Sequence, residues 1–291
     1  MNISIKYLTQ LYPNKYKALD DINLEISDGL FGLLGPNGAG KSTLMRILVT
    51  LMKPTNGKVS MGGYDLFKDR QQIRAMLGYL PQDFSTFPKI KTWEFLDYSA
   101  RLAGLKERSK RTQKIDELLE RVGLFDAREK LTSKLSGGMK RRVGIAQALL
   151  GDPKILIVDE PTTGLDPEER IRFRNLLTEM TKDERIIILS THIVGDISST
   201  CNDMALLNLG KLAFKGSPYE LIDMARPFTF RLEVDDAMLE KLKQEHIIIS
   251  TVPVDNGWQV DIVAKSVNGF PAKNVEPNLE HAYVCFMELL I

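Results

Sequence analysis

The sequence predicts an α/β fold, in which a mainly parallel sheet has helices on both faces, followed by a small α+β domain. Three observations support this prediction. Short apolar strands alternate with helical segments through most of the chain. Two of these strands run directly into glycine-rich or acidic loops, where parallel sheets place their ligand sites. Near Arg226 the pattern changes to closely spaced strands, and 291 residues suffice for two domains.

The first part of the chain, residues 1–225, carries the alternating pattern. Its N-terminal residues alternate like a strand and lack the apolar core of a signal peptide. A buried strand at 30–35 leads through a glycine-rich loop into a helix at 41–52. Further on, we expect strands at 57–63, 77–83, 154–159 and 185–190, helices at 167–180 and from residue 193, and a hairpin at 204–216.

Residues 91–150 are predicted to form a helical subdomain. Thr92 is a suitable N-cap for its first helix, which has an apolar stripe and a terminal glycine. A second helix covers residues 112–124, and a third begins near Ser136. The aromatic residues at 83–95 suit either a core or an exposed groove that receives a partner helix, and the sequence leaves both interpretations open.

Residues 226–291 are predicted to form an α+β accessory domain. Strands are expected at 226–234, 246–254 and 256–264, and helices at 236–245 and 278–290. The region holds 6 Lys/Arg against 10 Asp/Glu, so it is poorly suited to bind phosphates or nucleic acid.

The overall composition is ordinary for a globular protein, with 43% hydrophobic and 26% charged residues. A net charge of +1 gives no general attraction to nucleic acid or to an anionic membrane. Cys201 and Cys285 lack metal-ligand spacing, so we expect reduced thiols in a cytosolic protein. The longest apolar runs are too short to span a membrane, so any membrane role needs another polypeptide.

The segment GPNGAGKST fits the pattern G-x-x-x-x-G-K-[ST] of a phosphate-binding loop, and it lies between a strand and a helix as that pattern requires. Gly38 and Gly40 let the backbone curl so that N–H groups point at phosphate oxygens. Lys41 would reach the β- and γ-phosphates, Ser42 would ligate Mg²⁺, and Thr43 would hold the α-phosphate. The remaining loop residues expected at the nucleotide are Gly35, Pro36, Asn37 and Ala39.

The segment KILIVDEP is an apolar strand that ends in two carboxylates, at the edge of the sheet where the phosphate loop also lies. Asp159 is therefore placed to hold Mg²⁺, and Glu160 to polarise a water for attack on the γ-phosphate. Taken alone, a strand that ends in solvated acids is an equally good interpretation.

Gln82 and His192 each follow a predicted strand. Alone, either residue is more often structural than catalytic. Their places at the carboxyl ends of strands favour a role at the ligand site, because open α/β sheets bind ligands there.

A second anion site is indicated by the segment KLSGGMKRRVGIAQALLG. Ser136, Gly137 and Gly138 stand at the N-terminus of a helix, where free N–H groups and the helix dipole favour an anion. Ser136 lies 101 residues after Gly35, with a helical region between them. We infer that this site caps a nucleotide held by a second molecule.

Together these motifs resemble the nucleotide-binding subunit of an ABC transporter. They occur in that family's order: an aromatic residue, the phosphate loop, a glutamine, the LSGG signature, the acidic strand with a catalytic glutamate, the GLDP segment and a histidine. The resemblance covers roughly residues 1–225. It implies a P-loop NTPase cassette that binds ATP and Mg²⁺ and hydrolyses ATP.

The resemblance also implies roles for residues that are weak signals alone. Tyr12 would stack on adenine, with Tyr16 as the alternative, and Gln82 would link Mg²⁺ and the attacking water to the transmembrane partner. Asp166 would cross a dimer interface, and His192 would contact the γ-phosphate as a sensor. The implied partners are an integral membrane permease on a separate chain and a second ATPase subunit, identical or different, without nucleic acid. The implied location is the cytoplasmic face of the membrane.

Two features refine the resemblance. Met139 stands where the family usually has glutamine, and a methionine cannot make that glutamine's polar contact. The segments LSGGMKRR and DPKILIVDEPTTGLDP are most similar to the subfamily that powers ABC-2-type exporters, which includes drug- and antibiotic-efflux ATPases. The segment VEPNLEHAYVCFMELL resembles the end of the accessory domain in those ATPases.

Three alternatives remain: an ABC ATPase that acts on DNA or ribosomes, an importer ATPase, and a cassette that binds ATP without hydrolysis. The spacing between Gly35 and Ser136 leaves no room for the long coiled coil of chromosome-type members, and ribosome-acting members carry two cassettes. The tail is short for the barrel domain of sugar importers. The presence of both Glu160 and His192 argues against a cassette without hydrolysis.

Overall fold

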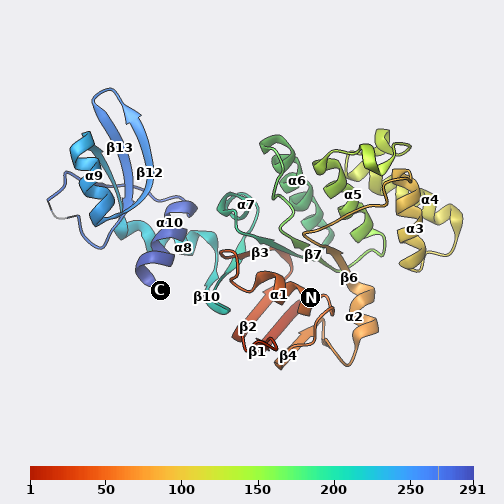
Figure 1. Cartoon of the computed structure of the whole chain (residues 1–291). Helices are drawn as coiled ribbons and strands as arrows, with labels where there is room; N and C mark the ends of the chain where they lie inside the picture. Colours follow the sequence, from red (N-terminus) through yellow and green to blue (C-terminus); the bar gives the residue numbers. More distant parts are fainter. Residues whose placement is uncertain (268) are drawn as a thin grey trace. The chain divides into compact units, whose positions relative to one another are not determined.

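The computed structural model describes residues 1–267 and 269–291, which form two compact units, Met1–Lys215 and Gly216–Ile291 (Figure 1). The main sheet of the first unit has the strand order β10-β9-β3-β8-β7-β6. Pairing is parallel from β9 through β3, β8 and β7 to β6, which confirms the predicted mainly parallel sheet. Its strands are β3 (Gly29–Leu34), β6 (Leu77–Leu80), β7 (Ile155–Asp159), β8 (Ile186–Thr191), β9 (Asp203–Asn208) and β10 (Lys211–Gly216).

The central strands β7 and β8 are buried along their whole length. Their sequences, ILIVD and IIILST, are continuous apolar runs that end in polar residues. Such runs are typical of parallel strands covered on both faces, where neither side chain row meets water. The polar residues at their carboxyl ends therefore emerge together at one edge of the sheet.

A second sheet in the same unit is antiparallel, with the order β2-β1-β4-β5. The strands at the N-terminus and at 57–63 were predicted from the sequence, but β2 was not. That strand is hard to recognise because Asp20 and Asp21 interrupt its alternation and the pairing with β1 shifts register three times. The strands are β1 (Asn2–Leu11), β2 (Lys17–Ser27), β4 (Asn56–Met61) and β5 (Tyr64–Asp65).

The helix after the glycine-rich loop is shorter than predicted. It ends at Leu48 rather than at residue 52, because Thr50 adopts the left-handed conformation with φ 62°. The backbone N–H groups of Leu51 and Met52 then donate back to the carbonyl of Arg46, which closes the helix end. The helices of the first unit outside the helical subdomain are α1 (Lys41–Leu48), α2 (Arg70–Met76), α6 (Pro167–Met180) and α7 (Val194–Ser198).

The predicted helical subdomain contains three helices that group together in Figure 1: α3 (Thr92–Leu102), α4 (Arg108–Arg121) and α5 (Gly137–Leu149). The predicted N-cap at Thr92 is wrong by one residue. Lys91 occupies the cap position, and its backbone N–H donates to Glu94 at 2.7 Å. Thr92 is instead buried, with its hydroxyl donating to the carbonyl of Lys130 at 3.1 Å.

The aromatic segment before and within α3 divides between the two interpretations that the sequence left open. Phe95 is 5% exposed and packs edge-on against Phe84 and Phe87. Phe87 and Tyr98 contact each other but are 55% and 51% exposed. The cluster therefore has a core residue beneath an exposed aromatic surface.

The second unit is a four-stranded antiparallel sheet with helices, in the order β12-β13-β11-β14. It begins at Gly216, whereas the sequence placed the change of pattern at residue 226, so α8 belongs to it. Its apolar core includes Leu232, Leu242 and Ile262. Its elements are α8 (Pro218–Ala225), β11 (Thr229–Val234), α9 (Asp236–Glu245), β12 (Ile247–Val254), β13 (Gly257–Val263), β14 (Lys273–Asn274) and α10 (Leu279–Cys285).

Cys201 and Cys285 are both free and buried. Burial raises the pKa of the Cys201 thiol to about 12, so it stays protonated at neutral pH. Within residues 1–267 and 269–291, no helix is both long and apolar enough to cross a membrane.

Candidate active site

The glycine-rich loop joins β3 to α1, as the sequence predicted, and its shape depends on glycine. Gly40 precedes the helix with φ 106°, a conformation that other residues rarely adopt. A Cβ at Gly40 would also lie 2.5 Å from the carbonyl oxygen of Ala18. The loop can therefore bend tightly only with glycine at this position. It leads directly into the N-terminus of α1, where free backbone N–H groups favour an anion.

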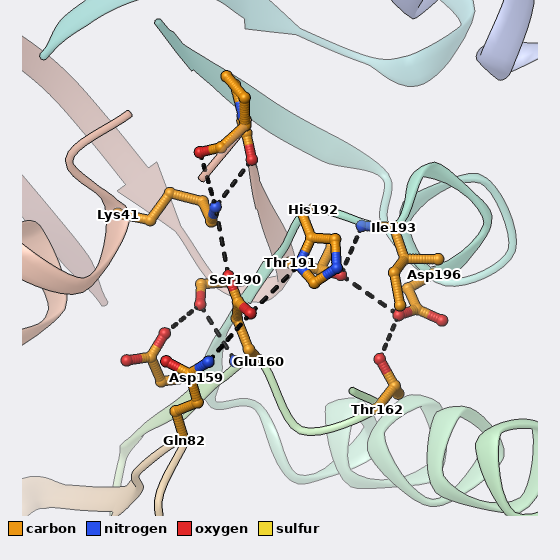
Figure 2. A network of polar contacts seen from close by, with 12 residues as sticks. Lys41, Gln82, Asp159, Glu160, Thr162, Ser190, Thr191, His192, Ile193 and Asp196 are labelled. Atoms are coloured by element: carbon orange, nitrogen blue, oxygen red, sulfur yellow. Dashed lines mark hydrogen bonds and ion pairs between the residues drawn. The ribbon is translucent and has the colours of Figure 1, made fainter. Parts of the chain in front are cut away.

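Lys41 begins α1 and is only 4% exposed. Its ammonium donates to the carbonyl oxygens of Gly35 at 2.7 Å and Pro36 at 3.2 Å (Figure 2). The same nitrogen lies 3.3 Å from the Glu160 carboxylate. Lys41 is thus held over the loop, facing the carboxylate at the end of β7.

A cavity of about 280 Å³ lies in front of the loop. It brings together residues that the sequence placed in separate motifs. The loop and α1 contribute Asn37, Gly38, Gly40, Lys41, Ser42 and Thr43, and the other walls come from Tyr12, Tyr16, Ala18, Gln82 and Glu160.

Both tyrosines that the sequence proposed for adenine stacking lie at this cavity. Their rings stack on each other with centroids 6.3 Å apart. The Tyr12 hydroxyl lies 3.2 Å from the Thr43 hydroxyl, and the Tyr16 hydroxyl donates to the Gly38 carbonyl at 3.2 Å. Tyr16 is 50% exposed and is the more exposed of the two residues.

Glu160 is the residue on which the predicted catalytic groups converge. It is 5% exposed, and its carboxylate contacts three side chains from separate segments (Figure 2). Lys41 lies 3.3 Å from one oxygen; Gln82 donates to the other at 3.3 Å, and His192 Nδ1 lies 3.1 Å from that same oxygen. The sequence named all four residues, and the structure places them at one point.

The backbone of Glu160 is in the left-handed region, with φ 44°. Such a conformation costs a non-glycine residue on the order of 1–3 kcal/mol and occurs often at functional sites. Two bonds from its N–H hold it, one to the Ser190 carbonyl at 3.0 Å and one to the Ser190 hydroxyl at 3.2 Å. The sharp turn after Asp159 points the Glu160 side chain toward Lys41.

Asp159 is 3% exposed and accepts a hydrogen bond from the Ser190 hydroxyl. Burial raises the pKa of its carboxyl group, and the charge of Glu160 raises it further. The Ser190 hydrogen bond and the Lys41 charge act in the opposite direction and favour the ionised form. A buried carboxylate of this kind is a group that a cation would stabilise.

Asp196, four residues after His192, is a buried polar residue that the sequence did not predict to be part of the site. Asp196 is 0% exposed and accepts hydrogen bonds from the hydroxyls of Thr162 and Thr191. Thr191 also accepts from the backbone N–H of Ile193 at 2.9 Å (Figure 2). These bonds tie the turn that carries His192 to the segment that follows Glu160. No sequence signal distinguishes this aspartate from an exposed one on a short helix.

The second predicted anion site lies at the start of α5. The Ser136 hydroxyl accepts from the Met139 N–H at 3.1 Å, so Ser136 is the N-cap of the helix and is itself exposed. A Cβ at Gly138 would lie 2.3 Å from a carboxylate oxygen of Glu169, so the helix start packs closely on α6. Of the residues that the structure describes, none from 136–138 lines the cavity of the phosphate loop.

Asp166 is the N-cap of α6, and its carboxylate accepts from the Glu169 N–H at 2.8 Å. The capping side chain stabilises the helix that lies under Gly138.

A glycine-rich loop between a strand and a helix, together with a strand that ends in two acidic residues, defines the class of P-loop nucleoside triphosphatases. Comparison with known proteins specifies the family. The sequence pattern described as "ABC transporter" matches residues 19–163. The chain belongs to the ABC transporter ATP-binding proteins, and it is the ATP-binding, ATP-hydrolysing subunit of such a transporter.

Two relatives illustrate the similarity. An uncharacterized ABC transporter ATP-binding protein of Bacillus subtilis is 35% identical over 262 residues, which are 88% of this chain and 84% of that protein. The Nod factor export ATP-binding protein I of Cupriavidus metallidurans is 35% identical over 222 residues, which are 76% of this chain and 73% of that protein.

Solved structures show the same fold. The structure of cbiO1 from Clostridium perfringens, described as part of the ABC transporter complex cbiONQ, superposes with a TM-score of 0.70 at 28% identity. That match covers 83% of this chain and 94% of the other. A dimeric bacterial ABC transporter cassette superposes with a TM-score of 0.67 at 26% identity, over 74% of this chain and 98% of the other.

Proposed function

We propose that ATP binds in the cavity of the phosphate loop, with its phosphates on residues 35–43 and its adenine against Tyr12 or Tyr16. The observation that supports this proposal most strongly is the convergence of Lys41, Gln82 and His192 on the Glu160 carboxylate. The Glu160 carboxylate is the proton acceptor that phosphoryl transfer to water needs. Lys41 supplies a cation, Gln82 an amide and His192 an imidazole beside it.

In this proposal Lys41 changes partner when ATP binds. Its ammonium then contacts the β- and γ-phosphates in place of the Glu160 carboxylate, through charge-assisted hydrogen bonds. Glu160 is released to accept a proton from the attacking water, and His192 contacts the γ-phosphate.

Mg²⁺ fits the oxygen ligands present. Ser42 and Gln82 line the cavity, and Asp159 supplies a buried carboxylate whose ionised form a cation would favour. Mg²⁺ is usually held by one or two carboxylates together with substrate phosphates rather than by an all-protein cage. When bound, the ion would neutralise negative charge on the phosphates.

We further propose that a complete ATP site needs two chains. Ser136, Gly137 and Gly138 would cap ATP on the phosphate loop of a second subunit, and Asp166 would lie at the interface between the subunits. The exposed N-terminus of α5 and its separation from the chain's own cavity support this arrangement. The solved dimeric cassette is a precedent for pairing.

The transporter that this subunit drives is proposed to be an exporter. A relative named for Nod factor export supports this direction, as does the resemblance of the signature segment to ABC-2-type ATPases. A separate permease would hold the subunit at the inner face of the membrane. The structurally similar cbiO1 is likewise part of an ABC transporter complex, cbiONQ. The exposed aromatic surface of Phe87 and Tyr98 is the proposed contact for that permease.

Mixed subunits test the two-chain site. Lys41→Ala removes the phosphate contact, and Ser136→Arg places a bulky side chain in the capping position. Neither variant should form a closed, ATP-occluding dimer alone. Their heterodimer contains one intact site, made from the loop of the Ser136→Arg chain and the cap of the Lys41→Ala chain.

We expect mixing to restore ATP occlusion at about one site per heterodimer. Occlusion is measured rather than turnover because hydrolysis at the two sites can be coupled. Mixing without any gain in occlusion, where tagged heterodimers are recovered, would show that the signature serves its own chain's loop. A Glu160→Gln chain that stays monomeric with Mg-ATP would instead point to a different ATPase chain as partner. Identifying the membrane polypeptide that co-purifies with the subunit tests the exporter proposal.

A further inference from the structure

Arg141 lies in the second turn of α5, on the helix that begins at Ser136. Its guanidinium donates to the carbonyl oxygen of Pro81 at 3.2 Å and to that of Gln82. The side chain is partly buried, and burial lowers the pKa of its guanidinium while the nearby charge of Asp83 opposes this effect. A desolvated cation with two carbonyl acceptors is a strong, directional anchor.

Both the backbone and the side chain of Gln82 make hydrogen bonds. Its backbone carbonyl accepts from the Arg141 guanidinium, and its side-chain amide donates to the Glu160 carboxylate at 3.3 Å. A continuous path of hydrogen bonds therefore runs from α5 through Gln82 to Glu160 within one chain.

The contact between α5 and this segment is close as well as polar. A Cβ at Gly144, three residues after Arg141, would lie 2.5 Å from Leu80 and 3.1 Å from Phe84. Leu80 and Phe84 flank Gln82 on either side, so α5 packs against the segment both before and after it. A displacement of α5 toward this segment would therefore press on the side chains on both sides of Gln82.

We propose that Arg141 is a positioning residue that sets Gln82 against Glu160, so that events at the N-terminus of α5 change the Glu160 site of the same chain. This proposal rests on the proposed function, in which that N-terminus caps ATP held by a second chain. When one chain caps the ATP on its partner's phosphate loop, Arg141 and Gln82 of the capping chain would then change the position of that chain's own Glu160. The two ATP sites of a dimer are thereby coupled through a short path inside each subunit.

A double-mutant cycle on ATP hydrolysis by the full chain with Mg²⁺ tests the role. Arg141→Ala should lower kcat about tenfold and change KM for ATP less than about twofold, because the residue does not reach ATP and acts on the chemical step. In a Gln82→Ala background the same substitution should lower kcat by less than about twofold, since the side chain that it positions is gone. Arg141→Lys should recover part of kcat because it retains a charged donor.

Arg142→Ala is the matched control on the same helix. Arg142 donates to the carbonyls of Val122 and Gly123 at 3.2 Å, away from Gln82, so its effect should be the same with or without Gln82. If the fold-losses in kcat caused by Arg141→Ala and by Gln82→Ala multiply fully in the double variant, Arg141 acts independently of Gln82 and the proposal is overturned. If Arg141→Ala does not fold, the cycle is run with Arg141→Lys and Arg141→Gln and judged by the same criterion.

Lys41→Ala in the same assay distinguishes a failure of the proposed function from a failure of the positioning role of Arg141. An active Lys41→Ala chain would overturn the proposed function itself. An inactive Lys41→Ala chain, together with full multiplication of the Arg141 and Gln82 effects, would overturn the positioning role alone.

Discussion

Glu160→Gln should separate ATP binding from ATP hydrolysis. The substitution keeps the shape of the side chain and removes its negative charge. Lys41, which is 4% exposed and lies 3.3 Å from that carboxylate, would then keep only the carbonyls of Gly35 and Pro36 as partners. ATP phosphates would supply the missing counter-charge.

The expected changes in Kd and kcat can be estimated from the distance between Lys41 and Glu160. Two unit charges 3.3 Å apart attract by about 5 kcal/mol at an effective dielectric constant of about 20. Desolvation of both groups offsets most of this attraction, so we take the net stabilisation by the Lys41–Glu160 ion pair to be about 1 kcal/mol. Because ATP no longer has to displace a carboxylate from Lys41, its Kd should fall about fivefold. Loss of the proton acceptor should lower kcat by about 10² to 10⁴.

Three measurements on the full chain check this prediction. Calorimetric titration gives Kd for ATP, a phosphate-release assay gives kcat, and thermal unfolding with and without ATP gives the stabilisation by ligand. The variant should unfold at a lower temperature without ATP and gain more from ATP than the wild type, because ATP restores a partner to a buried cation.

Asp261→Asn is the matched control for the loss of a buried carboxylate. Asp261 accepts two hydrogen bonds from Arg231 in the second unit, so its replacement should lower stability and leave Kd for ATP unchanged. A Glu160→Gln chain that binds ATP more weakly than wild type, and loses kcat by the same factor, would contradict the assignment of Glu160 as the proton acceptor. Glu160 would then be a structural partner of Lys41 rather than the proton acceptor.

Two further predictions concern the second unit. A chain ending at Lys215 should fold and hydrolyse ATP at a rate within about threefold of the full chain, because every proposed site residue lies in Met1–Lys215. A fragment that is insoluble or does not bind ATP would contradict this prediction. Burial lowers the pKa of His281 below its usual 6.5 although Asp261 opposes this, so stability that is present above that pH should be lost as pH falls. His281→Gln should flatten the decline in unfolding temperature below about pH 6.5, and an unchanged slope would assign it to other groups.

The features that sequence could predict are those whose chemistry fixes the residue type. The phosphate loop is recognisable because only glycine fits the backbone at Gly40, and because a lysine and a hydroxyl residue must follow at fixed positions. The strand ILIVD is recognisable because burial on both faces demands a continuous apolar run. Both signals are local, so no knowledge of distant contacts was needed.

Other features depend on contacts between distant segments. Asp196 is indistinguishable by sequence from an exposed acid. In the structure it is buried, and one of its hydrogen bonds comes from Thr162, which lies 34 residues away in the sequence. The end of α1 at Leu48 depends on the left-handed turn at Thr50, in a stretch whose apolar pattern continues to Met52. The contact between Arg141 and Gln82 joins residues 59 positions apart. Arg141 follows the LSGG segment and Gln82 follows β6, so no single sequence motif contains both residues.

The two anion sites in one chain are explained by the symmetry of the proposed dimer. The phosphate loop has its own cation and its own carboxylate. The N-terminus of α5 has the exposed residues Ser136 and Gly137 and no cation in the capping segment 136–138. In a two-fold dimer, each surface that a chain gives to its partner is also received from that partner. A loop and a cap on each chain therefore make two identical complete sites. Because α5 also holds Gln82 through Arg141, the chain that supplies a cap is the one whose own Glu160 responds when that cap is engaged.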